Sequence, residues 1–241
     1  MAPDEIDRIA ALDHDAAALE AAAHMAGPDA PVPWCPDWTV TDLLEHAGSV
    51  LYRASLIIGE RREHRPHRTE TTAPPGDPFG WFAQGHRAIV PVLRAADPDV
   101  EYLTFRGPNP LRWWLRRLAD ETLVHRVDAE QAAGIAPRID AAHAVDGIDE
   151  KLDTYLPVVA RNQCLGRALV VTLRADDTSA TWTVALDADG EVTEPAAPPE
   201  AVAHGDAAAL YLWFWRRAPD DSVDVDGDRT AATALRDSAS V

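Results

Sequence analysis

Glu121 and His125 lie four residues apart in the predicted helix 110–134, at positions where the hydrophobic pattern calls for apolar side chains. Residues with this spacing share one face of a helix, so the sequence places a carboxylate and an imidazole together in a stripe that should be buried. Burial of both groups is unfavourable unless each is compensated, and a bound divalent cation compensates both. The stripe that they interrupt consists of Leu111, Trp114, Leu118, Ala129 and Ala132.

A second histidine breaks the pattern in the same way. His46 stands between Leu43 and Val50 on the inner side of the predicted helix 39–58. Across a bundle of helices it would complete a His/Glu/His set, which leaves a fourth zinc position for water or substrate, as in catalytic sites. The same spacings also fit a solvated Glu–His pair and hydrogen-bonded core histidines.

The first part of the chain is predicted to form a four-helix bundle, because four segments carry apolar residues at spacings of three and four. Thr39 is expected to cap the second helix, and Asn109 with Pro110 to begin the fourth, which Gly134 ends. The four segments cover residues 4–25, 39–58, 77–97 and 110–134, and residues 59–76 form a long polar loop.

The last part of the chain changes character and predicts a small second domain. A helix is expected from Gly147 to Cys164, and β-branched residues then predict strands. Strands are predicted at 167–174, 180–187 and 222–227, with helices at 205–217 and at the C-terminus. The sequence therefore predicts two domains, residues 1–145 and residues 146–241.

Composition excludes several classes of function. The chain has 241 residues and a formal net charge of −18, so its surface repels nucleic acids and anionic bilayers. No apolar run approaches the roughly 20 residues of a membrane-spanning helix. The two cysteines, Cys35 and Cys164, form neither a disulfide framework nor a CxxC motif, which favours the cytoplasm. Motifs of nucleotide-binding proteins and serine hydrolases are also missing.

Four segments resemble the mycothiol-dependent maleylpyruvate isomerase family. WCPDWTVTDLLEHAG (34–48) resembles its CPxWTVxDLxxHxG segment, and LRRLADETLVHRVDAEQAAG (115–134) resembles its RRxxHExxxHRxDAE helix. AVDGIDEKLD (144–153) and LYLWFWRRAP (210–219) resemble later segments of the family. One departure is Asp120, which stands where many members have histidine, and whose offset from the stripe predicts that it is not a metal ligand.

The resemblance implies a DinB-like four-helix bundle followed by a small α+β domain of the sterol-carrier-like kind. It implies that His46, Glu121 and His125 bind a divalent metal, most simply Zn²⁺, and that mycothiol is the thiol cofactor. A zinc ion with an open position deprotonates a bound thiol near neutral pH. The thiolate would then add to an electrophilic alkene such as maleylpyruvate, giving cis–trans isomerisation or thiol S-transfer.

Several assignments stay open at this stage. Arg53 and Arg216 are candidates to bind substrate carboxylates, although surface arginines are usually solvated. Cys35 is either a fourth ligand, a redox thiol or part of an anchoring turn, and His86 either faces the site or is a hydrogen-bonded core histidine. A metal-dependent hydrolase and a non-catalytic DinB-like binding module are the alternative functions. The protein is expected to be a monomer or a homodimer.

Overall fold

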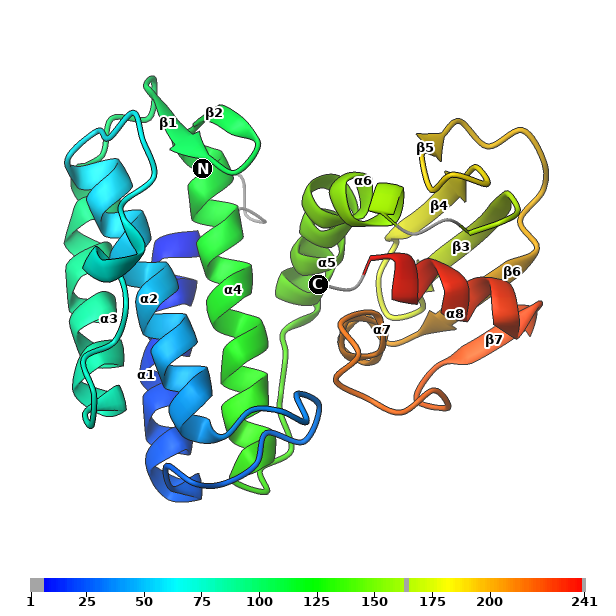
Figure 1. Cartoon of the computed structure of the whole chain (residues 1–241). Coiled ribbons are helices and arrows are strands. Elements are labelled where there is room, and N and C mark those ends of the chain that lie inside the picture. Colours follow the sequence, from blue (N-terminus) through cyan, green and yellow to red (C-terminus); the bar gives the residue numbers. More distant parts are fainter. Residues whose placement is uncertain (1–6, 163–164, 240–241) are drawn as a thin grey trace. The chain divides into compact units, whose positions relative to one another are not determined.

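The computed structural model describes residues 7–162 and 165–239 and contains two compact units, Met1–Pro137 and Arg138–Val241 (Figure 1). The expected division between residues 145 and 146 falls inside a helix of the second unit, whereas the observed units divide between Pro137 and Arg138. In the described residues, no helix combines the length and the apolar character needed to cross a membrane. Residues 4–6 and Cys164, which were predicted to be helical, lie outside the described residues.

The first unit is the predicted four-helix bundle, with its long helices side by side in Figure 1. Helix α2 packs along α3, and α1 packs along α4. The helices are α1 (Arg8–Ala26), α2 (Val40–Gly59), α3 (Pro78–Ala95) and α4 (Leu111–Ala132), with a 3₁₀ turn η1 (Arg68–Glu70) in the long loop. The helical first region and the sheet-containing second region confirm the predicted fold class.

The predicted helix ends follow from local chemistry. The Thr39 side chain accepts a hydrogen bond from the backbone N–H of Asp42, whose carboxylate accepts one from the Thr39 backbone N–H, 2.8 Å away. This capping box fixes the start of α2, seven residues before His46. At the end of α4, Gly134 adopts a left-handed φ of 72°, and the N–H of Ile135 donates to the carbonyl of Glu130. Glycine takes this conformation without steric cost, so it ends the helix.

The start of α4 differs from the expectation. Residues predicted as one extended piece and a turn form a hairpin, β1 (Glu101–Thr104) and β2 (Gly107–Pro110). The Asn109 side-chain amide donates to Thr104 Oγ1 and to the Gly107 carbonyl, so Asn109 closes the hairpin instead of capping the helix. The prediction that Asn109 begins α4 is therefore wrong, and Pro110 occupies the cap position.

Close packing of α2 on α3 holds the middle of α2 in place. A Cβ atom on Gly85 would lie 2.6 Å from the Gly48 carbonyl oxygen, and a Cβ atom on Gly48 would lie 2.9 Å from the backbone of Phe82. Only glycine fits at both positions, so the two helix backbones approach each other closely. Because His46 precedes Gly48 by two residues on the same helix, this contact also fixes the position of His46.

Buried charges link α1 to α4. The Arg126 guanidinium lies 3.5 Å from a carboxylate oxygen of Asp15 and 3.9 Å from one of Glu130. The three side chains are only 10–14% exposed. We call Asp15, Arg126 and Glu130 the α1–α4 ion cluster. Burial is the largest influence on the Glu130 carboxyl and raises its pKa, and the charge of Asp15 also raises it.

The second unit contains a five-stranded sheet in the order β5-β4-β3-β6-β7, in which β3 and β6 are parallel and the other neighbours antiparallel. Helices α7 and α8 pack on β3 and β6, and α5 packs on α7. The strands are β3 (Leu169–Ala175), β4 (Thr181–Leu186), β5 (Val192–Thr193), β6 (Ala201–Gly205) and β7 (Asp224–Gly227). The helical elements are α5 (Ala141–Glu150), the π-helical turn η2 (Lys151–Tyr155), α6 (Leu156–Val159), η3 (Ala160–Asn162), α7 (Ala207–Phe214) and α8 (Arg229–Ser238).

Two features of this unit correct the expectations. The helix predicted to begin at Gly147 begins at Ala141, because the Asp140 side chain accepts a hydrogen bond from the Ala142 N–H. Strand β6 was not predicted, since its five residues follow a proline-rich stretch and carry no clear alternation. Its backbone nevertheless joins two strands of the sheet, β3 on one side and β7 on the other.

Candidate metal centre

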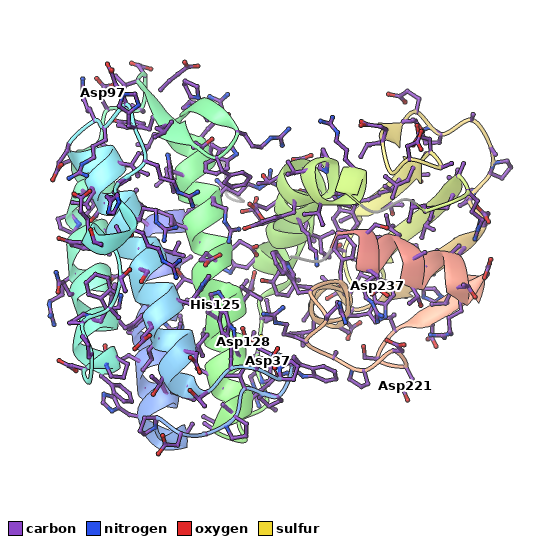
Figure 2. All side chains as sticks on the ribbon, viewed as in Figure 1. Asp37, Asp97, His125, Asp128, Asp221 and Asp237 are labelled. Atoms are coloured by element: carbon purple, nitrogen blue, oxygen red, sulfur yellow. The ribbon has the colours of Figure 1, made fainter. Side chains whose placement is uncertain are left out.

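Helix α4 carries a row of charged side chains along one face. Arg117, Glu121, His125 and Asp128 follow one another at spacings of four, four and three residues, and all four are buried. Such spacings place neighbours one helical turn apart. Figure 2 shows His125 and Asp128 side by side on α4, where His125 Nδ1 lies 2.9 Å from Asp128 Oδ2.

His46 reaches this row from α2. Its Nε2 lies 3.1 Å from Glu121 Oε1, and His125 Nε2 lies 3.4 Å from the same oxygen. The three predicted metal-binding residues thus come together, with one potential ligand atom each and all three atoms within 4.8 Å of one another. We call them the His/Glu/His cluster. Ligand atoms of a tetrahedral zinc ion are about 3.3–3.6 Å apart, and the two distances to Glu121 Oε1 are close to this spacing.

The cluster is open on one side. The His46 side chain is 41% exposed, whereas those of Glu121 and His125 are 11% and 8% exposed. Trp38, in the loop before α2, covers part of the cluster: its ring centroid is 4.9 Å from that of His46 and 6.0 Å from that of His125. Approach is therefore possible beside His46, while α4 closes the opposite side.

Charges within the cluster shift the pKa values of its members. Burial raises the pKa of the Glu121 carboxyl, but the charges of Arg117 and His125 outweigh it, so this pKa lies well below its usual range. Burial lowers the pKa of His125, whereas Glu121 and Asp128 raise it to about 9. Without a metal, His125 therefore carries a proton at neutral pH, and the cluster already holds one positive charge.

Further buried charges lie next to the His/Glu/His cluster on α4. The Arg117 guanidinium donates a hydrogen bond to Glu121 Oε2 and lies 3.6 Å from Asp120 Oδ2. Asp120 lies outside the His/Glu/His cluster, and that it is not a metal ligand stays a prediction. The Asp120 and Asp128 carboxylates are buried like that of Glu121, and they lie beside Arg117 and His125 respectively.

The two candidate substrate arginines lie in different units. Arg53, on α2, is half-buried, and within the described residues its guanidinium has no hydrogen bond or ion pair. Burial is the largest influence on Arg53 and lowers its pKa; the charge of Arg65 lowers it further, and that of Glu121 raises it. Arg53 is thus within electrostatic reach of the cluster. Arg216, which follows α7, is exposed and lies 4.0 Å from Asp237.

Cys35 and His86 do not belong to the His/Glu/His cluster. The backbone carbonyl of Cys35 accepts a hydrogen bond from the Trp38 N–H, and its N–H donates to the Val32 carbonyl, so Cys35 forms part of an anchoring turn. His86 lies on α3 and its Nε2 is 2.8 Å from Asp13 Oδ1 on α1. His86 is therefore a paired histidine between two helices.

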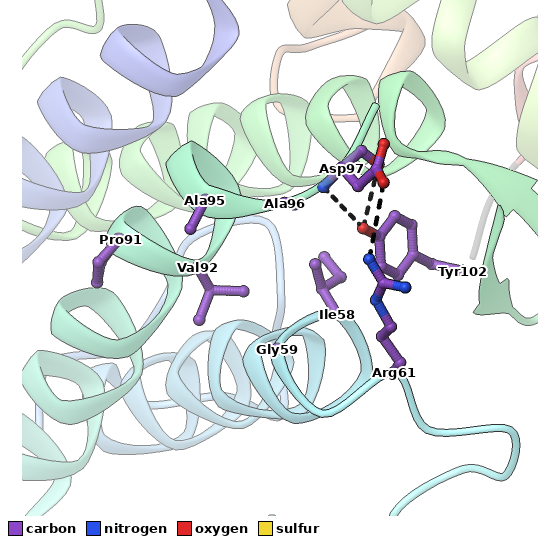
Figure 3. A pocket seen from close by; sticks show the side chains of 9 residues that line it. All are labelled: Ile58, Gly59, Arg61, Pro91, Val92, Ala95, Ala96, Asp97 and Tyr102. Atoms are coloured by element: carbon purple, nitrogen blue, oxygen red, sulfur yellow. Dashed lines mark hydrogen bonds and ion pairs between the residues drawn. The ribbon is translucent and has the colours of Figure 1, made fainter. Parts of the chain in front are cut away.

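A cavity of about 320 Å³ lies at the other end of α2 (Figure 3). Apolar side chains such as Ile58 and Val92 line it, and Arg61 and Tyr102 both contact Asp97 at its edge. Ile58 follows His46 by twelve residues, which is about 18 Å along a helix. This cavity is therefore separate from the His/Glu/His cluster.

Three neighbours of the cluster were not predicted from the sequence: Asp128, Arg117 and Trp38. Asp128 and Arg117 carry a recognisable signal, because each stands one helical turn from a predicted ligand. Trp38 gives no comparable signal, since a loop residue has no periodicity that would place its ring.

Comparisons with known proteins identify the family and the fold of the chain. The chain matches the family described as Mycothiol maleylpyruvate isomerase N-terminal domain over residues 9–130, and the MDMPI C-terminal domain over residues 142–234. Two crystal structures of the mycothiol-dependent maleylpyruvate isomerase, one of them a histidine-to-alanine mutant, share the fold at TM-scores of 0.63 and 0.65. Their sequences are 16% and 15% identical to that of this protein. Each match covers 92% of this protein and 93% of the chain in the crystal structure.

None of the curated proteins searched matches the chain. The two domain families nevertheless follow each other in order and together span most of the sequence. The resemblance seen in the four sequence segments is confirmed, and the chain belongs to the mycothiol maleylpyruvate isomerase family.

Proposed function

We propose that this protein is a metal-dependent enzyme that uses mycothiol to transform a small electrophilic substrate, by cis–trans isomerisation or by thiol S-transfer. The observation that carries the proposal is the convergence of His46, Glu121 and His125 from two helices of a chain that belongs to this family. Two imidazoles and one carboxylate form a donor set that suits zinc and leaves a coordination position open.

Each residue has a defined task in this proposal. When bound, a divalent cation with an open position lowers the pKa of a thiol, so that the thiolate is available near neutral pH. His46 and His125 each direct Nε2 at the centre. Asp128 accepts the Nδ1 hydrogen of His125, which keeps the lone pair of Nε2 directed at the metal position. Glu121 supplies the negative charge.

Arg53 is proposed to bind a substrate carboxylate. Its guanidinium is half-buried, pairs with no carboxylate of the described chain and lies within electrostatic reach of Glu121. A cation held in this way is available for an incoming anion. For Arg216, the role in substrate binding stays a prediction, as do the cytoplasmic location and the oligomeric state.

Maleylpyruvate is the first substrate to test, because the structural relatives are named as mycothiol-dependent maleylpyruvate isomerases. The purified protein should contain close to one divalent metal ion per chain and should convert maleylpyruvate or another electrophilic alkene only when the thiol is present. His46→Ala and His125→Ala should each remove both the metal and the activity. His86→Ala is the matched control, since this histidine pairs with Asp13 outside the cluster.

Three results would contradict the proposal. One is a metal-free wild-type protein with full activity. Another is hydrolysis without any thiol, which indicates a metal-dependent hydrolase. The last is a cobalt-substituted protein whose absorption spectrum does not respond to mycothiol, which indicates a closed binding module without catalysis.

A further inference from the structure

The two carboxylate oxygens of Glu121 have different partners. Oε1 faces the two imidazoles, at 3.1 Å from His46 Nε2 and 3.4 Å from His125 Nε2. Oε2 accepts a hydrogen bond from the Arg117 guanidinium, one helical turn earlier on α4. A carboxylate that is free on both sides can bind a metal through one or both oxygens. Here a strong charge-assisted hydrogen bond occupies the second oxygen.

The Arg117 guanidinium also lies near a second carboxylate. Its second terminal nitrogen lies 3.6 Å from Asp120 Oδ2, and Arg117 and Asp120 are 5% and 4% exposed. If Arg117 faced Glu121 alone, its positive charge would oppose a cation bound at Oε1. The Asp120 carboxylate offsets that charge without itself joining the His/Glu/His cluster.

We propose that Arg117 and Asp120 are positioning residues that make Glu121 a one-oxygen metal ligand. Arg117 holds Oε2 away from the metal, and Asp120 offsets the charge of Arg117 so that the affinity for the cation is kept. A two-oxygen carboxylate would fill the coordination position that the thiol needs. This inference rests on the proposed function, because it presupposes that the His/Glu/His cluster binds a metal.

The two residues should have different signatures in cobalt(II) titrations followed by absorption spectroscopy. Asp120→Asn leaves Arg117 on Oε2 but removes a negative charge, so Co²⁺ should bind about tenfold more weakly, with an unchanged spectrum. Asp120→His, which introduces the residue that many family members carry, should act in the same direction. Arg117→Lys keeps the charge but not the planar two-sided guanidinium. Its spectrum should become weaker, as expected for a higher coordination number, with the affinity largely kept.

Glu130→Gln is the matched control, since it changes a partly buried acid on the same helix in the α1–α4 ion cluster. It should match the wild type in both affinity and spectrum. Far-ultraviolet circular dichroism establishes that each variant is folded, and the conservative Arg117→Lys avoids leaving Asp120 and Glu121 without a cation.

The possible failures are distinguishable. A wild-type protein that takes up no Co²⁺ contradicts the proposed function itself. A wild type that binds Co²⁺ contradicts only this inference if Asp120→Asn binds it within twofold of the wild-type affinity. The inference is also overturned if the Arg117→Lys spectrum equals that of the wild type.

Discussion

Helix α4 carries two groups of buried charges that are balanced in different ways. On the face toward α2, the Glu121 carboxylate lies beside both histidines of the His/Glu/His cluster, and the Asp128 carboxylate lies beside His125. On the face toward α1, the α1–α4 ion cluster places Asp15 and Glu130 around Arg126. Arginine keeps its charge at any ordinary pH, whereas histidine gains or loses a proton near neutrality.

This difference separates a structural group from a candidate functional one. Arg126 is a permanent cation, so the positive charge within the α1–α4 ion cluster does not depend on the protonation of a histidine. In the His/Glu/His cluster, the proton of His125 supplies part of the positive charge, and a metal can replace that proton. A buried carboxylate that pairs with a protonated histidine therefore forms a site where a metal ion can replace the proton.

The largest effect on stability is expected from Arg126→Met. The substitution leaves the buried Asp15 and the partly buried Glu130 without their shared guanidinium, so the free energy of unfolding should fall by about 3 kcal/mol, as for broken buried ion pairs. Metal affinity should stay within about twofold of the wild type, because Arg126 faces α1. Urea unfolding and metal titration measure the two quantities. A large loss of metal affinity would show that the two groups are coupled.

The next largest effect is expected in the dependence of metal affinity on pH. The pKa of His125 is raised to about 9 without metal, so below pH 9 the metal must displace a proton. From pH 7 to pH 9, His125 alone should strengthen metal binding about 50-fold, with close to one proton released from it per metal at pH 7. Competition titrations in matched buffers and proton-release measurements test this. An affinity that does not change with pH would contradict it.

The same pKa shift sets the stability of the metal-free protein. The folded-state pKa of His125 lies above its ordinary value of 6.5, so the ion pairs of this histidine stabilise the fold fully below pH 6.5. That contribution is lost as the pH rises through about 9. The unfolding temperature of the metal-free chain should therefore fall over this range relative to that of Glu121→Gln, in which the main partner of His125 is neutral.

Asp128→Asn should weaken metal binding about 10- to 100-fold, because the carboxylate that orients the His125 ring is lost. It should also lower the pKa of His125, since the Asp128 charge contributes to raising it. Metal titrations at pH 7 and pH 9 separate the two effects: the loss of orientation persists at both pH values, whereas the change in pKa favours binding at pH 7. Wild-type affinity at pH 9 would exclude an orienting role.

The sequence predicted the bundle and the three clustered residues because both depend on helical periodicity. The stripes of α2 and α4 are broken at His46, Glu121 and His125; Glu121 and His125 are buried, and a buried polar residue needs a partner. The structure places all three together, as expected. That they bind a metal stays a prediction.

Features that depend on contacts between distant segments were not predicted. Asn109 has the residue type of a helix cap, but the hairpin offers its amide two acceptors, so it turns away from α4. Strand β6 has only five residues, and the sheet rather than its own pattern determines its conformation. Trp38 lies in a loop, and the turn at Cys35 that brings its ring to the two histidines follows no period.

The smallest effect is expected from Glu130→Gln. Its carboxylate is the more distant partner of Arg126, at 3.9 Å, and burial already disfavours its charged form, which raises its pKa. An amide of the same shape should therefore change the free energy of unfolding by less than about 1 kcal/mol. Urea unfolding measures this change, and metal titration should give the wild-type affinity. If Glu130→Gln changed the metal affinity, the His/Glu/His cluster and the α1–α4 ion cluster would be electrostatically coupled. The distinction between a site whose cation is exchangeable and a site with a permanent arginine would then be wrong.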